Sequence, residues 1–176
     1  GRAAEAEPVS RAALEGIARA FGEDSPLMAA RHSNLGRVLA TLGRHDEALA
    51  QLALAQAAYR AQGNAMEALL RMHALEIELR TGRIAAGAAW AQALDARTRL
   101  EAGFPPHNPL RMAMLAPLLR IACSAPRELP CDPLREEALA GMSLPTTPAD
   151  ARQQIGLALA GSPLALASAA PDRLQP

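Results

Sequence analysis

The sequence predicts an all-α fold of stacked helical pairs, and three observations support this prediction. Alanine and leucine, both good helix formers, dominate a chain of 176 residues that is 50% hydrophobic. Aromatic residues, which favour strands, amount to 2%, and the sequence has no Asn-Gly or Asp-Gly hairpin signal. Glycines also recur at regular intervals. Together these features favour closely packed helices over a sheet.

Two series of glycines define the interval. In the first series arginine follows each glycine, and the steps are 42 and 39 residues: Gly1, Gly43 and Gly82. The second series has steps of 41 and 40 residues: Gly22, Gly63 and Gly103. Periods of this length are typical of helical-repeat proteins. Two turn glycines per period predict two helices per period.

The central copy shows the expected helical pattern on both sides of its turn glycine. Apolar residues recur at 3.6-residue spacing before the turn, at Leu35, Val38, Leu39 and Leu42. A second stripe follows the turn, at Ala48, Leu49, Leu52, Ala55 and Tyr59. We therefore expect an antiparallel helix pair joined at Gly43.

Prolines indicate where helices begin and where the regular array ends. Ser25-Pro26 and Asn108-Pro109 each place a capping side chain before a proline, which predicts two helix starts. Pro117 should kink the second of these helices. Only Pro8 and Pro26 precede residue 105, whereas the other twelve of the fourteen prolines lie at residue 105 or beyond. Repeats are thus expected over residues 1–123, a Pro-rich helical cap over 124–170 and a disordered tail over 171–176.

The cap is expected to hold two helices. Residues 132–141 begin with Asp-Pro, and residues 147–161 begin with Thr147, a capping residue, followed by its own proline. The second segment would cover the open end of the array, as a terminal repeat must.

Charge and hydropathy exclude some classes of partner. The 18 basic residues, all arginine, balance 18 acidic ones, so no net field points to nucleic acid. The apolar run at 157–170 is shorter than a membrane span and is interrupted by Gly-Ser-Pro, so no membrane insertion is expected. Cys123 and Cys131 are too far apart for a CxxC pair, and we expect two unrelated buried thiols.

The segment "GRHDEALA" at 43–50 brings together residues that serve in catalytic and metal sites. However, Arg44, His45, Asp46 and Glu47 are consecutive, and adjacent helical residues point about 100° apart, so their side chains do not converge. Asp46 and Glu47 instead suit the first turn of a helix. The chain also lacks histidine metal spacings, nucleophile motifs and phosphate-binding glycine loops. We expect no catalytic residue, metal or cofactor.

The segment "SNLGRVLATLGRHDEALAQLALA" resembles a tetratricopeptide repeat, with Leu35-Gly36 in the first helix, Gly43 in the turn, and Ala48 and Leu52 in the second helix. The long period and the "FGEDSP" link resemble the kinesin-light-chain variety. The resemblance covers residues 1–123 and implies an α-solenoid of antiparallel helix pairs with an irregular C-terminal helical cap. The sequence departs from the family pattern at His32, Leu39 and Arg60, where the family has a large aromatic, a tyrosine and a proline.

The resemblance also implies a binding surface, because the first helices of such repeats line a concave groove. In similar repeats an asparagine at the position of Asn34 hydrogen-bonds a bound peptide backbone. Pro117 occupies that position in the last copy. The implied partner-binding residues are Ser33, Asn34, Arg37 and Thr41 in one copy, Met72, His73, Glu76 and Arg80 in the next, and Arg120 in the last.

Two functions are compatible with these features. The first is a non-catalytic module that binds a protein or peptide on the concave face. The alternative is the C-terminal regulatory region of a bacterial serine/threonine kinase, because residues 1–26 are similar to arrays that follow such kinase domains. Self-association through alanine-rich surfaces is a third hypothesis. The cytoplasm is the expected compartment, unless a membrane span upstream places the repeats in the periplasm, where a Cys123–Cys131 disulfide would form.

Overall fold

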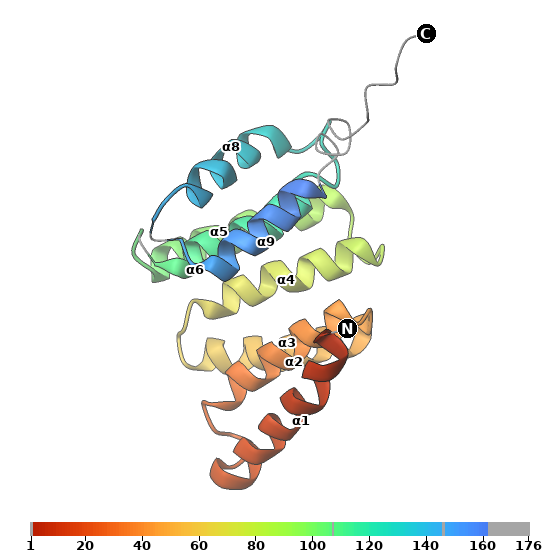
Figure 1. Ribbon diagram of the computed structural model, residues 1–176, viewed down its shortest axis with the longest axis vertical. Coiled ribbons are helices and arrows are strands. Elements are labelled where there is room, and N and C mark those ends of the chain that lie inside the picture. The colour runs from red at the N-terminus through yellow and green to blue at the C-terminus, as the bar shows by residue number, and fades with distance from the viewer. Residues whose placement is uncertain (1, 107, 146, 162–176) are drawn as a thin grey trace.

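The computed structural model describes residues 2–106, 108–145 and 147–161, and within them it contains nine helices and no strand (Figure 1). The all-α prediction is confirmed. In chain order the helices are α1 (Arg2–Phe21), α2 (Met28–Thr41), α3 (His45–Ala61), α4 (Met66–Arg80), α5 (Ala86–Gly103), α6 (Pro109–Ala113), α7 (Leu115–Ala122), α8 (Cys131–Met142) and α9 (Ala149–Ala160).

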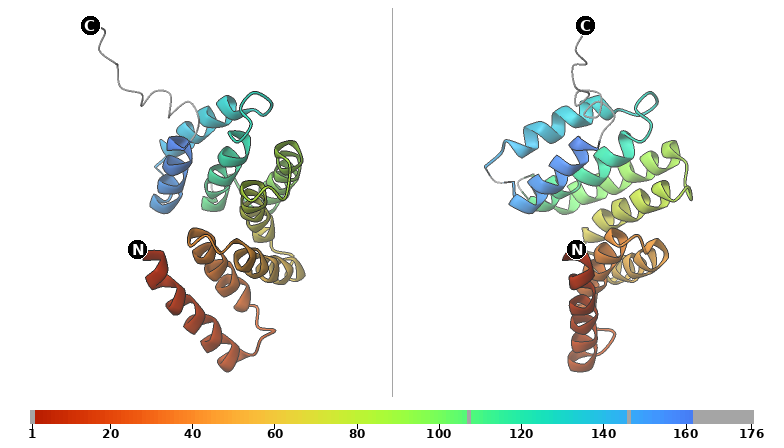
Figure 2. Two further views of the ribbon diagram at one scale, coloured as in Figure 1. Left: turned by 90° about the vertical axis from the view of Figure 1, so that its right-hand side faces the viewer. Right: turned by 45° about the vertical axis from the view of Figure 1, so that its right-hand side comes forward.

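The helices stack in pairs along the chain. Helix α2 packs on α3 and α4 packs on α5, while the contacts of α1 with α2 and of α3 with α4 join one pair to the next. Two further views show the stack running from α1 at one end to α8 and α9 at the other (Figure 2). Helix α7 takes the place of the next first helix, because it contacts α4, α5, α8 and α9. The prediction of an α-solenoid of antiparallel pairs is therefore confirmed.

Gly103 differs in structural role from the turn glycines of both series, Gly22, Gly43, Gly63 and Gly82, which all have positive φ. Gly43 and Gly82 adopt φ values of 77° and 72°, in the left-handed region that disfavours side chains, and each turns the chain between two helices. Gly103 does not adopt a positive φ. It ends α5 against Ala65, and a Cβ at Gly103 would collide with the Cβ of Ala65. Gly103 thus allows the end of α5 to lie close to Ala65, whereas the other glycines of its series form turns.

The arginines that follow the turn glycines connect neighbouring pairs. Arg44 donates to Glu7 of α1 at 2.5 Å, and Arg83 donates to Asp46 of α3. Each arginine therefore reaches back to the second helix of the preceding pair. Except for Glu7, these side chains are 40% exposed or more, so each pair contributes little free energy. Their repetition nevertheless explains why the Gly-Arg dipeptide recurs with the period.

Two apolar clusters form the core. The smaller cluster joins α2, α3 and α4 through Leu35, Leu39, Ala48, Leu52, Ala55, Leu70, Ala74 and Ile77. The larger cluster surrounds α7, in which Leu115, Leu118, Leu119 and Ile121 have no exposed surface, and it extends over α4, α5, α8 and α9. Small residues permit close contacts: a Cβ at Gly36 would lie 3.0 Å from Cγ of Leu52. The many alanines and glycines thus allow the helices to pack closely.

The predicted helix starts meet different outcomes. Asn108 caps α6 by accepting a hydrogen bond from the Leu110 amide at 2.9 Å, as expected. Ser25 instead accepts from the Leu27 amide at 3.3 Å, and α2 begins only at Met28, so the prediction that Pro26 opens the helix is wrong. Ser25 and Pro26 form a turn before the helix, closed by a hydrogen bond from the Met28 amide to the Ser25 carbonyl.

Pro117 has a stronger effect than a kink. The helix that starts at Pro109 is interrupted at Met114, and α7 begins at Leu115. Proline has no amide hydrogen to donate to the carbonyl four residues earlier, which here belongs to Ala113, the last residue of α6. The break therefore lies one turn before the proline that causes it.

The C-terminal part differs from the expectation in two respects. Cys123 and Cys131 form a disulfide with a Cα–Cα distance of 4.7 Å, so the prediction of two unrelated thiols is wrong. The loop between α7 and α8 folds back and brings these two helix ends together. Thr147 does not cap α9; its hydroxyl donates to the Gly141 carbonyl at the end of α8. The predicted segments 162–170 and 171–176 lie outside the described residues.

Candidate functional site

The candidate residues on α2 divide into buried and exposed groups. Ser33 is buried, whereas Asn34, Arg37 and Thr41 are exposed. The Thr41 hydroxyl donates to the Arg37 carbonyl at 3.0 Å, a bond within the last turn of the helix. On the exposed side of α2, the side-chain amide of Asn34 and the guanidinium of Arg37 are therefore the groups that a ligand can contact.

Helix α4 carries four candidates, and one of them faces the core. Met72 has no exposed surface and belongs to the larger apolar cluster. His73 and Glu76 are partly buried, and Arg80 is exposed. Adjacent helical residues point in directions about 100° apart, which is why Met72 packs into the core while His73 is only partly buried.

Arg120 connects α7 to α4. Its Nε lies 2.8 Å from Oε1 of Glu76, and Arg80 lies 4.0 Å from the same oxygen. The side chain of Glu76 is only 16% exposed, so it is held between two arginines from neighbouring first helices. Among the predicted partner-binding residues, three arginines thus accompany one carboxylate.

The pKa of His73 is affected by arginines from two neighbouring helices. Burial is the main cause that lowers its pKa to about 3, and the positive charges of Arg37 and Arg120 lower it further. Residues from α2, α4 and α7 therefore share one electrostatic neighbourhood, although they are 36 and 47 positions apart in the chain. At neutral pH the imidazole is uncharged. We call the surface formed by Asn34, Arg37, His73, Glu76, Arg80 and Arg120 the inner face.

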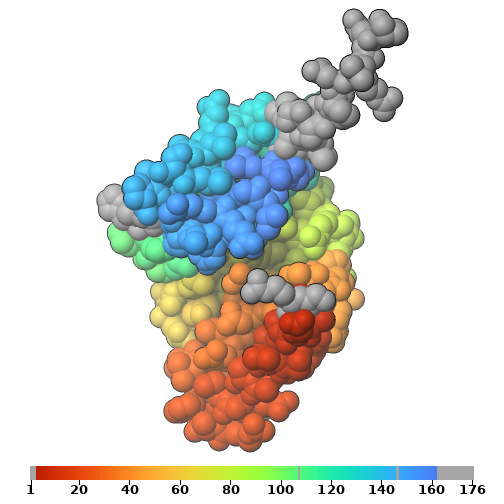
Figure 3. All heavy atoms as spheres, viewed as in Figure 1, coloured from red at the N-terminus to blue at the C-terminus, as the bar shows by residue number. Residues whose placement is uncertain are grey.

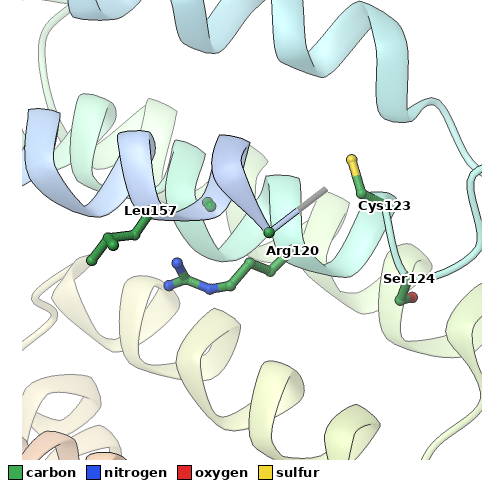
Figure 4. A pocket seen from close by; sticks show the side chains of 6 residues that line it. Arg120, Cys123, Ser124 and Leu157 are labelled. Atoms are coloured by element: carbon green, nitrogen blue, oxygen red, sulfur yellow. The ribbon is translucent and has the colours of Figure 1, made fainter. Parts of the chain in front are cut away.

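A recess lies at the C-terminal end of the inner face, between α7 and α9. It is lined by Arg120, Cys123, Ser124, Leu157, Ala158 and Gly161. The guanidinium of Arg120 extends along the space between α9 and α4 toward Leu157 (Figure 4). Leu157 is 59% exposed, because other residues of α9 form the face of the helix that is buried. The sequence signalled no role for Leu157, because its position could be assigned only after the packing of α9 was known.

The space-filling view shows this side of the molecule, where the surface is set back between α9 and the start of α1 (Figure 3). Extended ligands require such a surface, running over several helices rather than a single deep cavity.

A second polar group on α3, α4 and α5 was not predicted. Glu67 on α4 is buried, and it accepts hydrogen bonds from Arg99 of α5 at 2.5 Å and from Arg60 of α3 at 3.5 Å. Arg60 stands where the resembled family has a proline. The departure from the family pattern therefore supplies an ion pair between neighbouring repeats.

The charged side chains of "GRHDEALA" form ion pairs with one another and with neighbouring helices. Arg44 donates to Glu47 at 2.6 Å, and hydrogen bonds from arginine are the main cause that lowers the pKa of Asp46 and of Glu47. His45 begins α3, and its Nδ1 is buried without a hydrogen-bond partner. These contacts support the interpretation of the segment as the start of a helix.

The described residues hold neither a metal-binding cluster nor a membrane-spanning helix. No three histidine, cysteine, aspartate or glutamate side chains among them are grouped so that they could hold a metal ion. None of the helices in the described ranges has the length and apolar character needed to cross a membrane.

Stacked antiparallel pairs, turn glycines and a shared inner face define a helical-repeat protein. The family model for the tetratricopeptide repeat matches residues 1–61, which comprise α1, α2 and α3. Residues 1–61 are thus similar to tetratricopeptide repeats. No curated protein matches it. Tetratricopeptide repeats typically act in protein interaction, and the match indicates an interaction module over residues 1–61.

Proposed function

We propose that the chain binds an extended, acidic segment of a partner protein across α2, α4 and α7. The observation that carries this proposal is the shared neighbourhood of Arg37, His73 and Arg120, which belong to three different helices. Because His73 is uncharged at neutral pH, the arginines determine the charge that a ligand meets. A carboxylate-rich peptide is the complementary ligand.

Asn34, Arg37, Glu76 and Leu157 have distinct roles in this proposal. Asn34 is exposed and offers both a donor and an acceptor to a peptide backbone. Arg37 offers a planar fork that matches a carboxylate. Glu76 orients Arg120 through their contact at 2.8 Å, so that less side-chain entropy is lost when a ligand binds. Leu157 supplies an apolar contact beside Arg120. Ser33 and Met72, which are buried, contribute to packing instead.

The extent of the array is part of the proposal. We assign residues 1–123 to the repeats, since α4 to α7 continue the pairing of the matched segment. Residues 124–145 and 147–161 form the described part of the cap. Association with a kinase domain stays a prediction, and the sequence upstream of Gly1 tests it: a kinase would show a Gly-rich loop and HRD and DFG motifs.

Binding of fluorescein-labelled peptides, measured by fluorescence anisotropy, tests the acidic-ligand proposal. The probes are ten-residue peptides that differ only in having glutamate or glutamine at alternate positions. We expect the glutamate peptide to bind the wild-type chain, and Arg37→Gln with Arg120→Gln to weaken binding by about tenfold or more, which corresponds to about 1.4 kcal/mol.

The matched control removes two arginines elsewhere. Arg19 and Arg127 are exposed and lie on α1 and in the α7–α8 loop. Arg19→Gln with Arg127→Gln changes the net charge equally and should leave the affinity within about twofold. Equal losses in both double variants, or equal binding of the glutamate and glutamine peptides, would reject the proposal.

A further inference from the structure

The disulfide joins the two helices that flank the α7–α8 loop. Cys123 follows the last residue of α7, and Cys131 is the first residue of α8. The α1–α2, α2–α3, α3–α4 and α4–α5 links each contain a glycine with positive φ, whereas the link over residues 124–130 contains none. It has Pro126 and Pro130 instead. A covalent bond thus stands where the earlier links have a turn glycine.

Helix α8 has a small apolar contact with the rest of the molecule. Its buried residues are Cys131, Leu134, Ala138 and Gly141, so Leu134 is the one large aliphatic side chain that it buries. In α7, by contrast, seven of the eight residues are buried. Hydrophobic stabilisation scales with the apolar area removed from water, and a 12-residue helix is marginal on its own. Packing alone therefore holds α8 weakly.

Polar contacts add a limited amount. Arg97 of α5 donates to Glu137 of α8 at 2.7 and 3.0 Å, but Glu137 is 40% exposed and water screens the pair. Thr147 holds the C-terminal end of α8 through the carbonyl of Gly141. Neither contact secures the N-terminal end of the helix, where Cys131 lies.

We propose that the Cys123–Cys131 disulfide holds α8 against α7 under redox control. Reduction of the disulfide then releases α8 from α7 while the rest of the array stays folded. A dithiol breaks the Sγ–Sγ bond, which accepts two electrons and two protons and becomes two thiols. The dithiol is oxidised to its own disulfide. The bond limits the conformations that a detached α8 can adopt, and this limit disappears on reduction.

This inference goes beyond the proposed function and needs no peptide ligand. It couples the fold of the C-terminal part to the redox state of its surroundings, because disulfides persist in oxidising compartments and are reduced in the cytosol. Cys123 also lines the recess beside Arg120, so release of α8 changes the border of the inner face.

Hydrogen–deuterium exchange of the whole chain, before and after reduction with dithiothreitol, tests the proposal. We expect amides of residues 131–142 to exchange roughly ten- to hundredfold faster after reduction, while amides of α3 stay unchanged. Reoxidation should restore the slow exchange. The sequence contains only these two cysteines, so no other disulfide contributes to the change.

The double variant Cys123→Ala with Cys131→Ala is the control. It should show fast exchange in α8 with or without dithiothreitol. Reduction and reoxidation of the wild-type chain give a decisive result even if this variant does not fold. Three results would overturn the proposal: unchanged exchange of α8 on reduction, equal acceleration in α3 and α8, or alkylation of both cysteines in the untreated protein.

Discussion

His73 shows how one residue combines packing and electrostatics. Burial lowers its pKa, and the positive charges of Arg37 and Arg120 lower it further, so the neutral imidazole is the stable form in the folded chain at neutral pH. It lies between arginines that a ligand would contact. A protonated imidazole at this position would add a third cation to a neighbourhood that already disfavours one.

The stability of the fold should therefore depend on pH through His73. The pKa falls from 6.5 in the unfolded chain to about 3 in the folded one, so below pH 6.5 the unfolded state takes up a proton that the folded state does not. Stability contributed by this group is complete above pH 6.5 and is lost as pH falls toward 3. Between pH 7 and 5 we expect a loss of up to about 2 kcal/mol.

Urea unfolding of the wild-type chain and of His73→Gln at the two pH values measures this loss. The variant should lose less stability than the wild type over the same range. The other histidines and the carboxylates are present in both proteins and cancel in the comparison. Identical losses in the two proteins would show that folding does not lower the pKa of His73.

At the scale of helices, buried ion pairs and caps determine how the elements are joined. Glu67 is the clearest case, because it lies on α4 and receives arginines from α3 and α5. It is buried, so its charge is stabilised by those partners rather than by water.

Removing the Glu67 carboxylate should therefore cost more than removing an exposed one. We expect Glu67→Ala to lower the free energy of unfolding by about 2–4 kcal/mol, because Arg99 then loses its closest partner and α4 loses a link to both neighbours. Glu15→Ala, which removes an exposed pair with Arg19 at 3.8 Å, should change it by less than about 0.5 kcal/mol. Urea denaturation compares the two variants, and equal effects would contradict this account.

Element type was predictable from sequence, whereas local capping was predictable only in part. The 3.6-residue periodicity and the glycine period indicated paired helices, and these are present. Asn108, Ser25 and Thr147 carry the same kind of capping signal, yet only Asn108 caps a helix. Ser25 is used in a turn, and Thr147 bonds to α8, because contacts from other elements compete with the local signal.

Side-chain partners were beyond sequence reasoning for a physical reason. The disulfide depends on how the α7–α8 loop folds, and the cysteine spacing does not determine that path. The Glu67 network needs three helices in register. For the inner face, the repeat pattern selected residues on α2, α4 and α7, but two of them, Met72 and Ser33, face inward. When the position of a residue around the helix axis is predicted with a small error, a core residue is mistaken for a surface residue.

At the scale of the whole molecule, the stack combines a fixed N-terminal array with a C-terminal part held by a disulfide. Residues 1–61 carry the family match, and the inner face runs from this segment across α4 to α7. The central claim is that ligands bind across these first helices rather than on α3, α5 or α8.

Photo-cross-linking followed by mass spectrometry tests that claim most directly. The probe is the glutamate peptide with a benzophenone group at its centre, and the glutamine peptide with the same group is the control. The account predicts cross-links to α2, α4 and α7 that the glutamine peptide does not form. Cross-links confined to α3, α5 and α8, or equal yields from the two peptides, would contradict it.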